Sequence, residues 1–241
     1  MFSFFNTLSL VWQREKVIDI SDEYITWLTR MNIGFLEPGN LYCFDFAIRN
    51  LPDSYPIVEI GTYGGLSANA MTYYKALYQR QNRLITIDPW YFVDMNDTMR
   101  EDLPAAKPLS SKELRQFIKS RCLHNLEYFS NFDLPYLLEL FSDRFFEAWA
   151  ANQSLSDVFG RSITLGGGIG FAYIDGDHSY GQAYQDFCHC DRFLVPGGYL
   201  LFDDSADGSG WDVCEVVKKV LNYPDYELII KNPNYFFKKK G

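Results

Sequence analysis

Short apolar runs that end in a turn or in acidic residues are the most regular feature of this chain. Two of them, Gly170–Ile174 and Tyr199–Phe202, are separated by a stretch with helical spacing at Tyr180–Phe193 and by a Pro196-Gly197-Gly198 turn. Apolar runs of this length without polar alternation are typical of parallel strands that are buried on both faces. The segment therefore predicts a strand–helix–strand unit of a parallel sheet.

The same pattern continues toward both ends of the chain. Pro56–Gly61 and Leu84–Ile87 have the composition of buried strands, and the helix between them ends at about Arg80. The remaining predicted elements are a third strand at Asn125–Phe129, a hairpin of strands at Tyr226–Ile230 and Tyr235–Phe237, helices at Ser110–Arg121, Asp133–Trp149 and Trp211–Leu221, and a loop at Gln153–Gly168. Strands that alternate with helices in this way favour an α/β fold with a parallel sheet.

Residues 1–50 differ from the rest because they predict helices without a strand. Ser21-Asp22-Glu23 can cap one helix, and a second helical stretch covers Leu41–Arg49 after a turn at residues 37–40. We therefore expect an N-terminal helical cap at residues 1–50 and one α/β domain at residues 51–241. The acid-rich and proline-containing stretch at about 90–122 predicts an insertion at the rim of the sheet, where such segments commonly shape specificity.

Acidic residues follow two of the predicted strands directly. Asp175, Asp177 and His178 come after the first strand of the central unit, and Asp203 and Asp204 come after the second. Ligands of parallel sheets bind beyond the carboxyl ends of the strands, where these side chains would meet. Because clustered carboxylates repel one another, a hard divalent cation with oxygen ligands is the simplest companion. The alternative for Asp177 is a turn or helix-capping residue.

A glycine-rich turn follows the strand at Pro56–Gly61. The pattern from Glu59 to Ser67 is Glu-x-Gly-x-Tyr-x-Gly-x-Ser, so a helix start with free N–H groups and a close backbone approach could serve a ligand. Tyr63 occupies a position where a dinucleotide fingerprint carries glycine, so a plain NAD site fits poorly. Asp88 ends the second strand and is placed to accept the hydroxyl groups of a ribose, although it could also be a turn residue before Pro89.

The charge balance narrows the range of partners. The chain has 241 residues, a formal net charge of −9 and a sequence pI near 4.8, with 47% hydrophobic residues. Nucleic acids and anionic membranes bind basic faces, so neither is expected as a main partner. The five cysteines form no disulfide framework and indicate a reduced, cytoplasmic setting. Cys188-His189-Cys190 lacks the second pair that a zinc site requires, so we interpret it as part of a helix.

Taken together, these motifs resemble the class I S-adenosylmethionine-dependent methyltransferases. Residues 59–67, EIGTYGGLS, look like the first motif of the catechol-type O-methyltransferases. Residues 174–180, IDGDHSY, and residues 196–204, PGGYLLFDD, are similar to the macrocin O-methyltransferase type, which modifies sugar hydroxyls. The resemblance covers about Pro56 to the end of the chain. It implies a Rossmann-like, doubly wound, mostly parallel seven-stranded sheet with a C-terminal antiparallel hairpin.

The resemblance also implies roles for individual positions in binding the cofactor S-adenosylmethionine. The implied cofactor-binding residues are Gly61, Tyr63 and Gly65 in the turn under the methionine part, Glu59 organising that turn, Ser67 near the methionine carboxylate, and Asp88 at the ribose. Relatives carry Gly-Asp after the third strand, whereas this chain has Ser130-Asn131-Phe132 after its predicted third strand. The adenine contacts are therefore not transferred.

At the acidic rim, the resemblance implies a metal site and a catalytic base. Asp175, Asp203 and Asp204 match the Mg²⁺ ligands of the macrocin type, and His178 matches the proposed general base. We thus expect an O-methyltransferase, assisted by Mg²⁺ or another divalent cation, that acts on a hydroxyl of a small molecule, either a sugar or a phenol. The alternatives are a nicotinamide-dependent oxidoreductase and an inactive cofactor-binding scaffold. The aromatic N-terminal segment could pack against a second subunit in a homo-oligomer.

Overall fold

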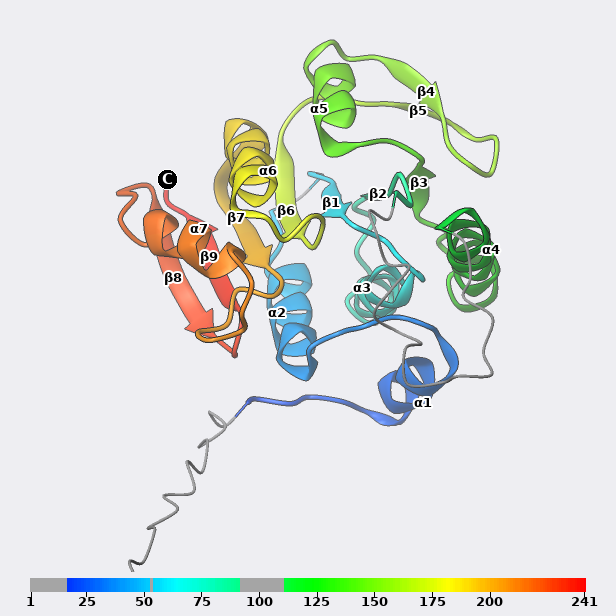
Figure 1. Ribbon diagram of the computed structural model, residues 1–241, viewed down its shortest axis with the longest axis horizontal. Helices are drawn as coiled ribbons and strands as arrows, with labels where there is room; N and C mark the ends of the chain where they lie inside the picture. The colour runs from blue at the N-terminus through cyan, green and yellow to red at the C-terminus, as the bar shows by residue number, and fades with distance from the viewer. Residues whose placement is uncertain (1–16, 53, 92–110) are drawn as a thin grey trace, which may run out of the picture.

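The chain folds around one seven-stranded sheet that is covered by helices on both faces (Figure 1). The computed structural model describes residues 17–52, 54–91 and 111–241. The strand order is β3-β2-β1-β6-β7-β9-β8; the first five strands run parallel, and β9 is antiparallel to both β7 and β8. The mostly parallel seven-stranded sheet with an antiparallel C-terminal hairpin is therefore confirmed.

The elements of the described residues have the following bounds. The strands of the main sheet are β1 Ile57–Ile60, β2 Leu84–Ile87, β3 Tyr136–Leu138, β6 Ile169–Ile174, β7 Leu194–Phe202, β8 Tyr226–Lys231 and β9 Tyr235–Lys239. A separate small sheet pairs β4 Ser154–Ser156 with β5 Ser162–Thr164. The helices are α1 Glu23–Met31, α2 Pro38–Arg49, α3 Leu66–Leu77, α4 Ser111–Phe129, α5 Ser142–Ala150, α6 Tyr180–Phe193 and α7 Val213–Val220.

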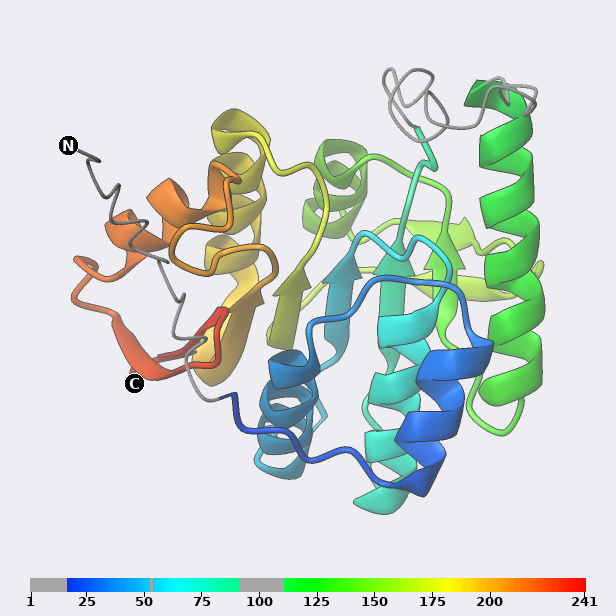
Figure 2. The same cartoon turned by 60° about the horizontal axis from the view of Figure 1, so that its bottom comes forward.

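Side chains that alternate along each strand feed two separate cores, one on each face of the sheet. On one face, Val58 and Ile60 pack in a cluster with residues of α5, α6 and α7. On the other face, Ile57 packs in a cluster with residues of α1, α2, α3 and α4. Figures 1 and 2 show the resulting helix–sheet–helix layers. Burial on both faces explains why the central strands are mostly apolar rather than alternating apolar and polar residues.

The register of the parallel strands places their carboxyl ends at one level. Ile60 of β1 is paired with Ile87 of β2 and with Ile174 of β6, and Ile174 is paired with Phe202 of β7. The residues that follow these four must therefore emerge side by side at one edge of the sheet. This edge is the upper one in Figure 2, where the arrowheads of the parallel strands point.

Of the two N-terminal helices, α1 packs against α3 and α2 packs against the sheet. Asp22 caps α1, because its side chain accepts a hydrogen bond from the backbone N–H of Ile25. Helix α2 begins at Pro38, earlier than predicted, because proline is well tolerated in the first turn of a helix. Phe44 of α2 contacts Tyr173 of β6 edge to face. Residues 1–16, and residues 92–110 of the predicted insertion, lie outside the described residues.

The predicted third strand at Asn125–Phe129 is wrong, because these residues form the end of α4. Ile118, Cys122, Leu126 and Phe129 recur at helical spacing, and all four are buried. One apolar stripe thus continues to the end of the helix. The aromatic residues near position 129 have high strand propensity, but this packing outweighs it.

The prediction of one helix at Asp133–Trp149 is also wrong in its first half. Strand β3 occupies Tyr136–Leu138, and α5 begins only at Ser142. A strand of three residues is too short to show periodicity in the sequence. The predicted loop at Gln153–Gly168 contains the β4–β5 hairpin, whose strands are equally short.

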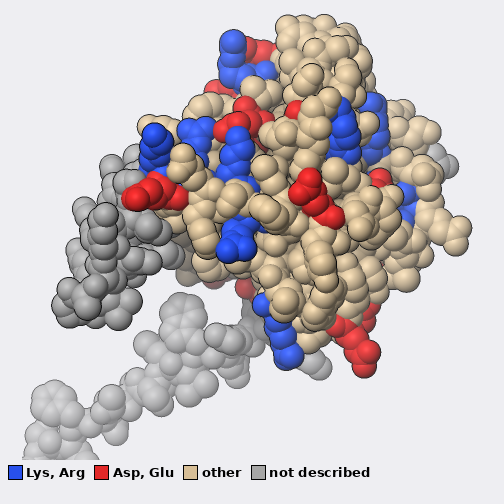
Figure 3. Space-filling view, turned by 90° about the vertical axis from the view of Figure 1, so that its right-hand side faces the viewer, with Lys and Arg blue, Asp and Glu red and all other residues tan. Residues whose placement is uncertain are grey.

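The surface carries charges of both signs. On the face shown in Figure 3, Lys and Arg side chains are interspersed with Asp and Glu and with uncharged surface. On α4, which lies on this side of the molecule, Arg115 and Lys119 both pair with Glu139. Among the residues that the structure describes, no helix combines the length and apolarity needed to cross a bilayer.

Burial of Asp186 on α6 makes the stability of the fold depend on pH. Its side chain is 1% exposed and accepts a hydrogen bond from Gln182, and burial raises the pKa of its carboxyl from 3.8 to about 6. A raised carboxyl pKa stabilises the folded state fully below pH about 4, and this stabilisation is lost as the pH rises through about 6. The protein should therefore lose stability across this window.

Replacing Asp186 by Asn should raise the free energy of unfolding at pH about 7.5 by roughly 1–2 kcal/mol, with little change near pH 4, because it removes a buried ionisable group. Urea denaturation at several pH values measures this. The exposed Asp225 is the matched control, and Asp225→Asn should leave the pH profile unchanged. A D186N profile parallel to that of the unmodified protein would contradict the expectation.

Candidate functional site

Four residues emerge together where the paired parallel strands end. Gly61, Asp88, Asp175 and Asp203 directly follow β1, β2, β6 and β7. Backbone hydrogen bonds continue the sheet by one residue here, from Asp175 N to Ile60 O at 2.8 Å and from Asp203 N to Ile174 O at 2.9 Å. The structure therefore brings the glycine turn and the predicted acids to the same edge.

The glycine turn has a backbone that ordinary side chains tolerate poorly. Gly61, Tyr63 and Gly65 have φ angles of 93°, 45° and 84°. A Cβ on Gly61 would lie 1.8 Å from the carbonyl oxygen of Asp175, so only glycine permits this close approach. Tyr63 adopts the left-handed conformation despite its side chain, and such strain is often found at ligand-binding loops.

The side chain of Asp88 holds the backbone of this turn through hydrogen bonds. Its Oδ2 accepts hydrogen bonds from the backbone N–H groups of Thr62 at 3.0 Å and Tyr63 at 2.7 Å, and its Oδ1 accepts one from Trp90 at 2.6 Å. Burial raises the pKa of the Asp88 carboxyl, and these hydrogen bonds oppose the shift. Asp88, the residue predicted to bind the ribose, therefore also fixes the strained backbone of the turn.

Glu59 lies beneath the turn and is completely buried. It accepts hydrogen bonds from the hydroxyl of Ser67 and, at 2.5 Å, from that of Thr86. Burial raises the pKa of Glu59 to about 7, while both hydroxyl donors lower it. Glu59 therefore ties β1 to β2 and to the first turn of α3. The Ser67 hydroxyl is directed to this carboxyl.

Asp175 and Asp203 crowd each other at the acidic rim. Burial raises the pKa of Asp175 well above its usual range, and the neighbouring carboxyl of Asp203 raises it further, both by its charge and by a hydrogen bond. Tyr173 on β6 donates a hydrogen bond to Asp175 at 3.1 Å. Two carboxyl groups this close, one of them with a strongly raised pKa, have the electrostatics of a site that favours a positive charge.

Two asparagines that sequence reasoning missed hold Asp203 in place. Nδ2 of Asn40 at the start of α2 and Nδ2 of Asn234 in the β8–β9 turn each donate to Asp203 Oδ1 at 2.6 Å. The carbonyl oxygen of the Asn234 side chain accepts from the backbone N–H groups of Ser205 and Ala206. Both asparagines are buried, and no local motif indicates them, because their partners are distant in sequence.

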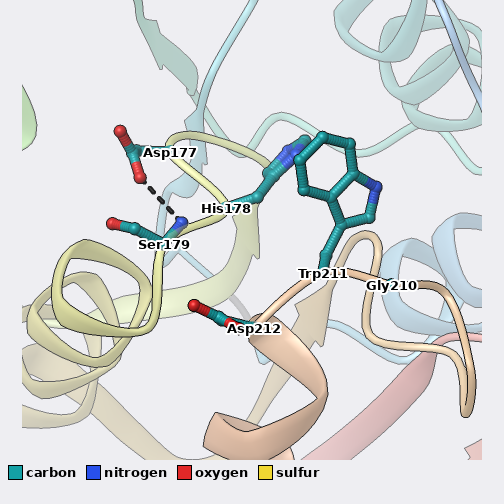
Figure 4. Close-up of a pocket in the computed structure, with 6 residues that line it drawn as sticks. All are labelled: Asp177, His178, Ser179, Gly210, Trp211 and Asp212. Carbon is teal, nitrogen blue, oxygen red and sulfur yellow. Dashed lines mark hydrogen bonds between the residues drawn. The ribbon is translucent and has the colours of Figure 1, made fainter.

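His178 lies between Asp204 and Asp175. Its Nδ1 is 3.2 Å from Asp204 Oδ2, and its Nε2 is 3.8 Å from Asp175 Oδ1. Asp204 has a φ of 50°, another strained position at this rim. The ring of Trp211 meets the imidazole edge to face at a centroid distance of 4.7 Å (Figure 4). Asp177 accepts from the backbone N–H of Ser179, the residue that caps α6, so it acts as a turn residue here.

The acids do not form a ready metal centre. Within the described residues, no group of three or more His, Cys, Asp and Glu side chains is gathered so that it could hold one ion. Asp203 Oδ1 is occupied by the two asparagine amides. The donor set is nevertheless chemically suited to a hard cation, because in the described part of the structure its carboxyl groups lie close to one another and to the His178 imidazole, with no Lys or Arg paired to them.

The predicted third-strand residues lie elsewhere. Because β3 ends at Leu138, Ser130-Asn131-Phe132 does not follow a strand and has no place at this edge of the sheet. The residue at the corresponding position is Glu139, which pairs with Arg115 and Lys119 of α4. Cys188 and His189 are helical residues of α6, and His189 Nε2 lies 2.9 Å from Asp143 of α5.

Comparisons with known proteins relate this chain to methyltransferases. A family model described as "Methyltransferase domain" matches residues 58–205, which include every predicted site residue. A short stretch of 50 residues is 40% identical to an uncharacterised protein of Acanthamoeba polyphaga mimivirus, covering 21% of this chain and 23% of the viral protein. The chain thus matches less than a quarter of the length of that relative.

Solved structures with a similar fold include several O-methyltransferases. TomG from Streptomyces achromogenes, solved with SAM, has a TM-score of 0.55 at 12% identity, covering 93% of this chain and 92% of TomG. PaMTH1 from Podospora anserina, solved with SAH, has a TM-score of 0.56 at 13% identity, covering 93% and 91%. CalS11, a TDP-rhamnose 3′-O-methyltransferase, has a TM-score of 0.53 at 17% identity, covering 84% and 79%. At these identities the likeness concerns the fold.

Truncating Asn234 should destabilise the protein markedly. Asn234→Ala removes a donor to Asp203 and leaves one buried and one partly buried backbone N–H group without an acceptor, so the free energy of unfolding should fall by about 2–4 kcal/mol. Urea denaturation measures this loss. Asn222 is exposed and donates only to the end of its own helix, so Asn222→Ala should cost less than about 0.5 kcal/mol. Equal effects of the two substitutions would show that the buried amide does not support the rim.

Proposed function

Because the chain belongs to the methyltransferase-domain family, we propose that it transfers the methyl group of S-adenosylmethionine to a hydroxyl oxygen of a small molecule. The observation that carries the proposal is the contact of the glycine turn with the acidic rim, where Gly61 packs directly against the backbone of Asp175. A cofactor on the turn and a hydroxyl at the acids would then be neighbours. Such alignment is most of what the reaction needs, because a sulfonium methyl is already activated.

In the proposed cofactor site, the methionine part lies over Gly61, Tyr63 and Gly65. Among the described residues, no side chain caps the start of α3, so its first N–H groups are available to a carboxylate near Ser67. Asp88 would accept ribose hydroxyls with the lone pairs that its three N–H donors leave free. Glu59 would act indirectly, by holding Ser67 and Thr86.

In the proposed acceptor site, His178 removes the proton of the hydroxyl. If Nδ1 donates to Asp204, Nε2 keeps its lone pair and faces the space beside Asp175. An oxygen lone pair would form the new bond to the methyl carbon as the carbon–sulfur bond breaks and its electrons stay on sulfur. The hydroxyl proton would pass to His178 Nε2. Asp204 would hold the imidazole in this tautomer and stabilise the imidazolium.

The proposed metal ligands are Asp175, Asp203 and Asp204. Asp203 would use Oδ2, because its Oδ1 accepts the two asparagine amides. A divalent cation at this position would orient the acceptor hydroxyl and lower its pKa. The asparagines would keep Asp203 directed at the site.

Two alternatives make different predictions. A nicotinamide-dependent oxidoreductase shares the strand, glycine turn and helix, but family membership and the tyrosine at position 63 favour methyl transfer. An inactive scaffold would bind the cofactor and transfer nothing. Binding of a nicotinamide cofactor in a titration would support the oxidoreductase. Release of S-adenosylhomocysteine in the presence of hydroxyl compounds would reject the inactive scaffold.

Calorimetry should detect binding of S-adenosylmethionine, and Asp88→Ala should weaken it at least tenfold, since a buried acceptor and the anchor of the turn are both lost (about 1.4 kcal/mol or more). Asp225→Ala, at an exposed carboxylate, is the control and should leave the affinity unchanged. Absence of binding would reject the cofactor. Unchanged affinity of D88A would reject the ribose assignment alone.

Titration with Mn²⁺ should show binding that Asp203→Asn weakens about tenfold or more, because a charged oxygen ligand is replaced by a neutral one. Excess EDTA should abolish turnover, and added Mg²⁺ should restore it. Full activity in EDTA together with no Mn²⁺ binding would reject the metal while leaving methyl transfer intact.

A further inference from the structure

A pocket adjoins the acidic rim and is not part of the glycine turn. It has a volume of about 390 Å³ and lies between the loop after β6 and the loop before α7 (Figure 4). Six residues line it: Asp177, His178, Ser179, Gly210, Trp211 and Asp212. A pocket of this size suits one or two rings of a small molecule. Since His178 is in its wall, a bound ring would lie next to the proposed base.

Trp211 supplies the large apolar surface of this pocket. Its side chain is 50% exposed although it packs edge to face on His178, so much of the indole remains available for contact. Its backbone N–H donates to the hydroxyl of Ser209 at 3.2 Å, and that hydroxyl donates to the carbonyl oxygen of Asp204 at 2.8 Å. The loop thus ties Trp211 to the acidic rim rather than leaving it as a free surface residue.

The charge of the lining is negative. Asp177 and Asp212 each carry a carboxylate, and among the residues that the structure describes no Lys or Arg lines the pocket. Helices α6 and α7 both begin here, and each N-terminus contributes about half a positive charge. Two half charges do not offset two full carboxylates, so an anion would meet net repulsion in this pocket.

We propose that Trp211 is the aromatic wall of the acceptor site and that the part of the acceptor held there is an uncharged, hydroxyl-bearing ring. The inference rests on the proposed methyl transfer and adds the substrate class to it. The ring would lie against the indole and present a hydroxyl to His178, while Asp177 accepts another of its hydroxyls and Asp212 contributes only negative charge to the wall of the pocket. Trp211 also positions His178 through the ring contact.

The test measures binding to the full chain loaded with S-adenosylhomocysteine. Two probe pairs differ in charge: catechol against 3,4-dihydroxybenzoate, and methyl α-rhamnoside against dTDP-rhamnose. In at least one pair, the neutral probe should bind at least fivefold more tightly than the anionic probe. Trp211→Ala should weaken its binding tenfold or more, and Trp211→Phe should restore it to within about threefold, because an aromatic face is retained.

Two further variants separate charge from folding. Asp212→Asn should improve binding of the anionic probe roughly threefold without changing that of the neutral probe, because within the described residues the Asp212 side chain caps no N–H of α7. Trp27→Phe, at another partly exposed tryptophan on α1, should change nothing. Affinity for S-adenosylhomocysteine should stay within twofold throughout.

The possible failures are distinguishable. Failure of the unmodified protein to bind S-adenosylhomocysteine would overturn the proposed function and this inference with it. If S-adenosylhomocysteine binds but neither neutral probe does, or if the anionic probes bind as well as the neutral ones, the acceptor class is overturned alone. Unchanged neutral-probe binding by W211A would remove Trp211 from the site.

Discussion

The common register of the parallel strands is the constraint on which the rest of the site depends. Because Ile87, Ile60, Ile174 and Phe202 are paired across β2, β1, β6 and β7, the chain leaves all four strands at one level. A shift of one residue in any strand would direct its next side chain to the other face of the sheet. The separation of the acids from the glycine turn is therefore fixed by backbone hydrogen bonds, and the loops only refine it.

This arrangement places several acidic side chains close together, and hydrogen-bond donors from different parts of the fold hold each of them. Near the turn, backbone N–H groups hold Asp88, and hydroxyls hold Glu59. At the rim, asparagine amides hold Asp203, and a tyrosine hydroxyl holds Asp175. All of these donors are neutral, so they orient the carboxyl groups without adding a positive charge. The site therefore retains its attraction for a cation or for a proton in transit.

Much of this architecture could be predicted from the sequence. The buried strands at 57–60, 84–87 and 169–174 are mostly apolar runs, and the acids that follow the last two mark the functional edge. The elements that were mispredicted are short or ambiguous. Tyr136–Leu138 has too few residues to show a period, and Phe129 belongs to a helix because of the core it meets. Contacts such as those of Asn40 and Asn234 depend on chain segments that meet only after folding.

The asparagine contacts also determine how much of this chain must be grafted into another protein to keep Asp203 in place. The family match ends at residue 205, whereas Asn40 precedes it and Asn234 follows it. A chimera that grafts only the matched segment into another scaffold would carry Asp203 without its two amide donors. A chimera that keeps both amide donors to Asp203 must therefore include α2 and the β8–β9 hairpin together with the matched segment.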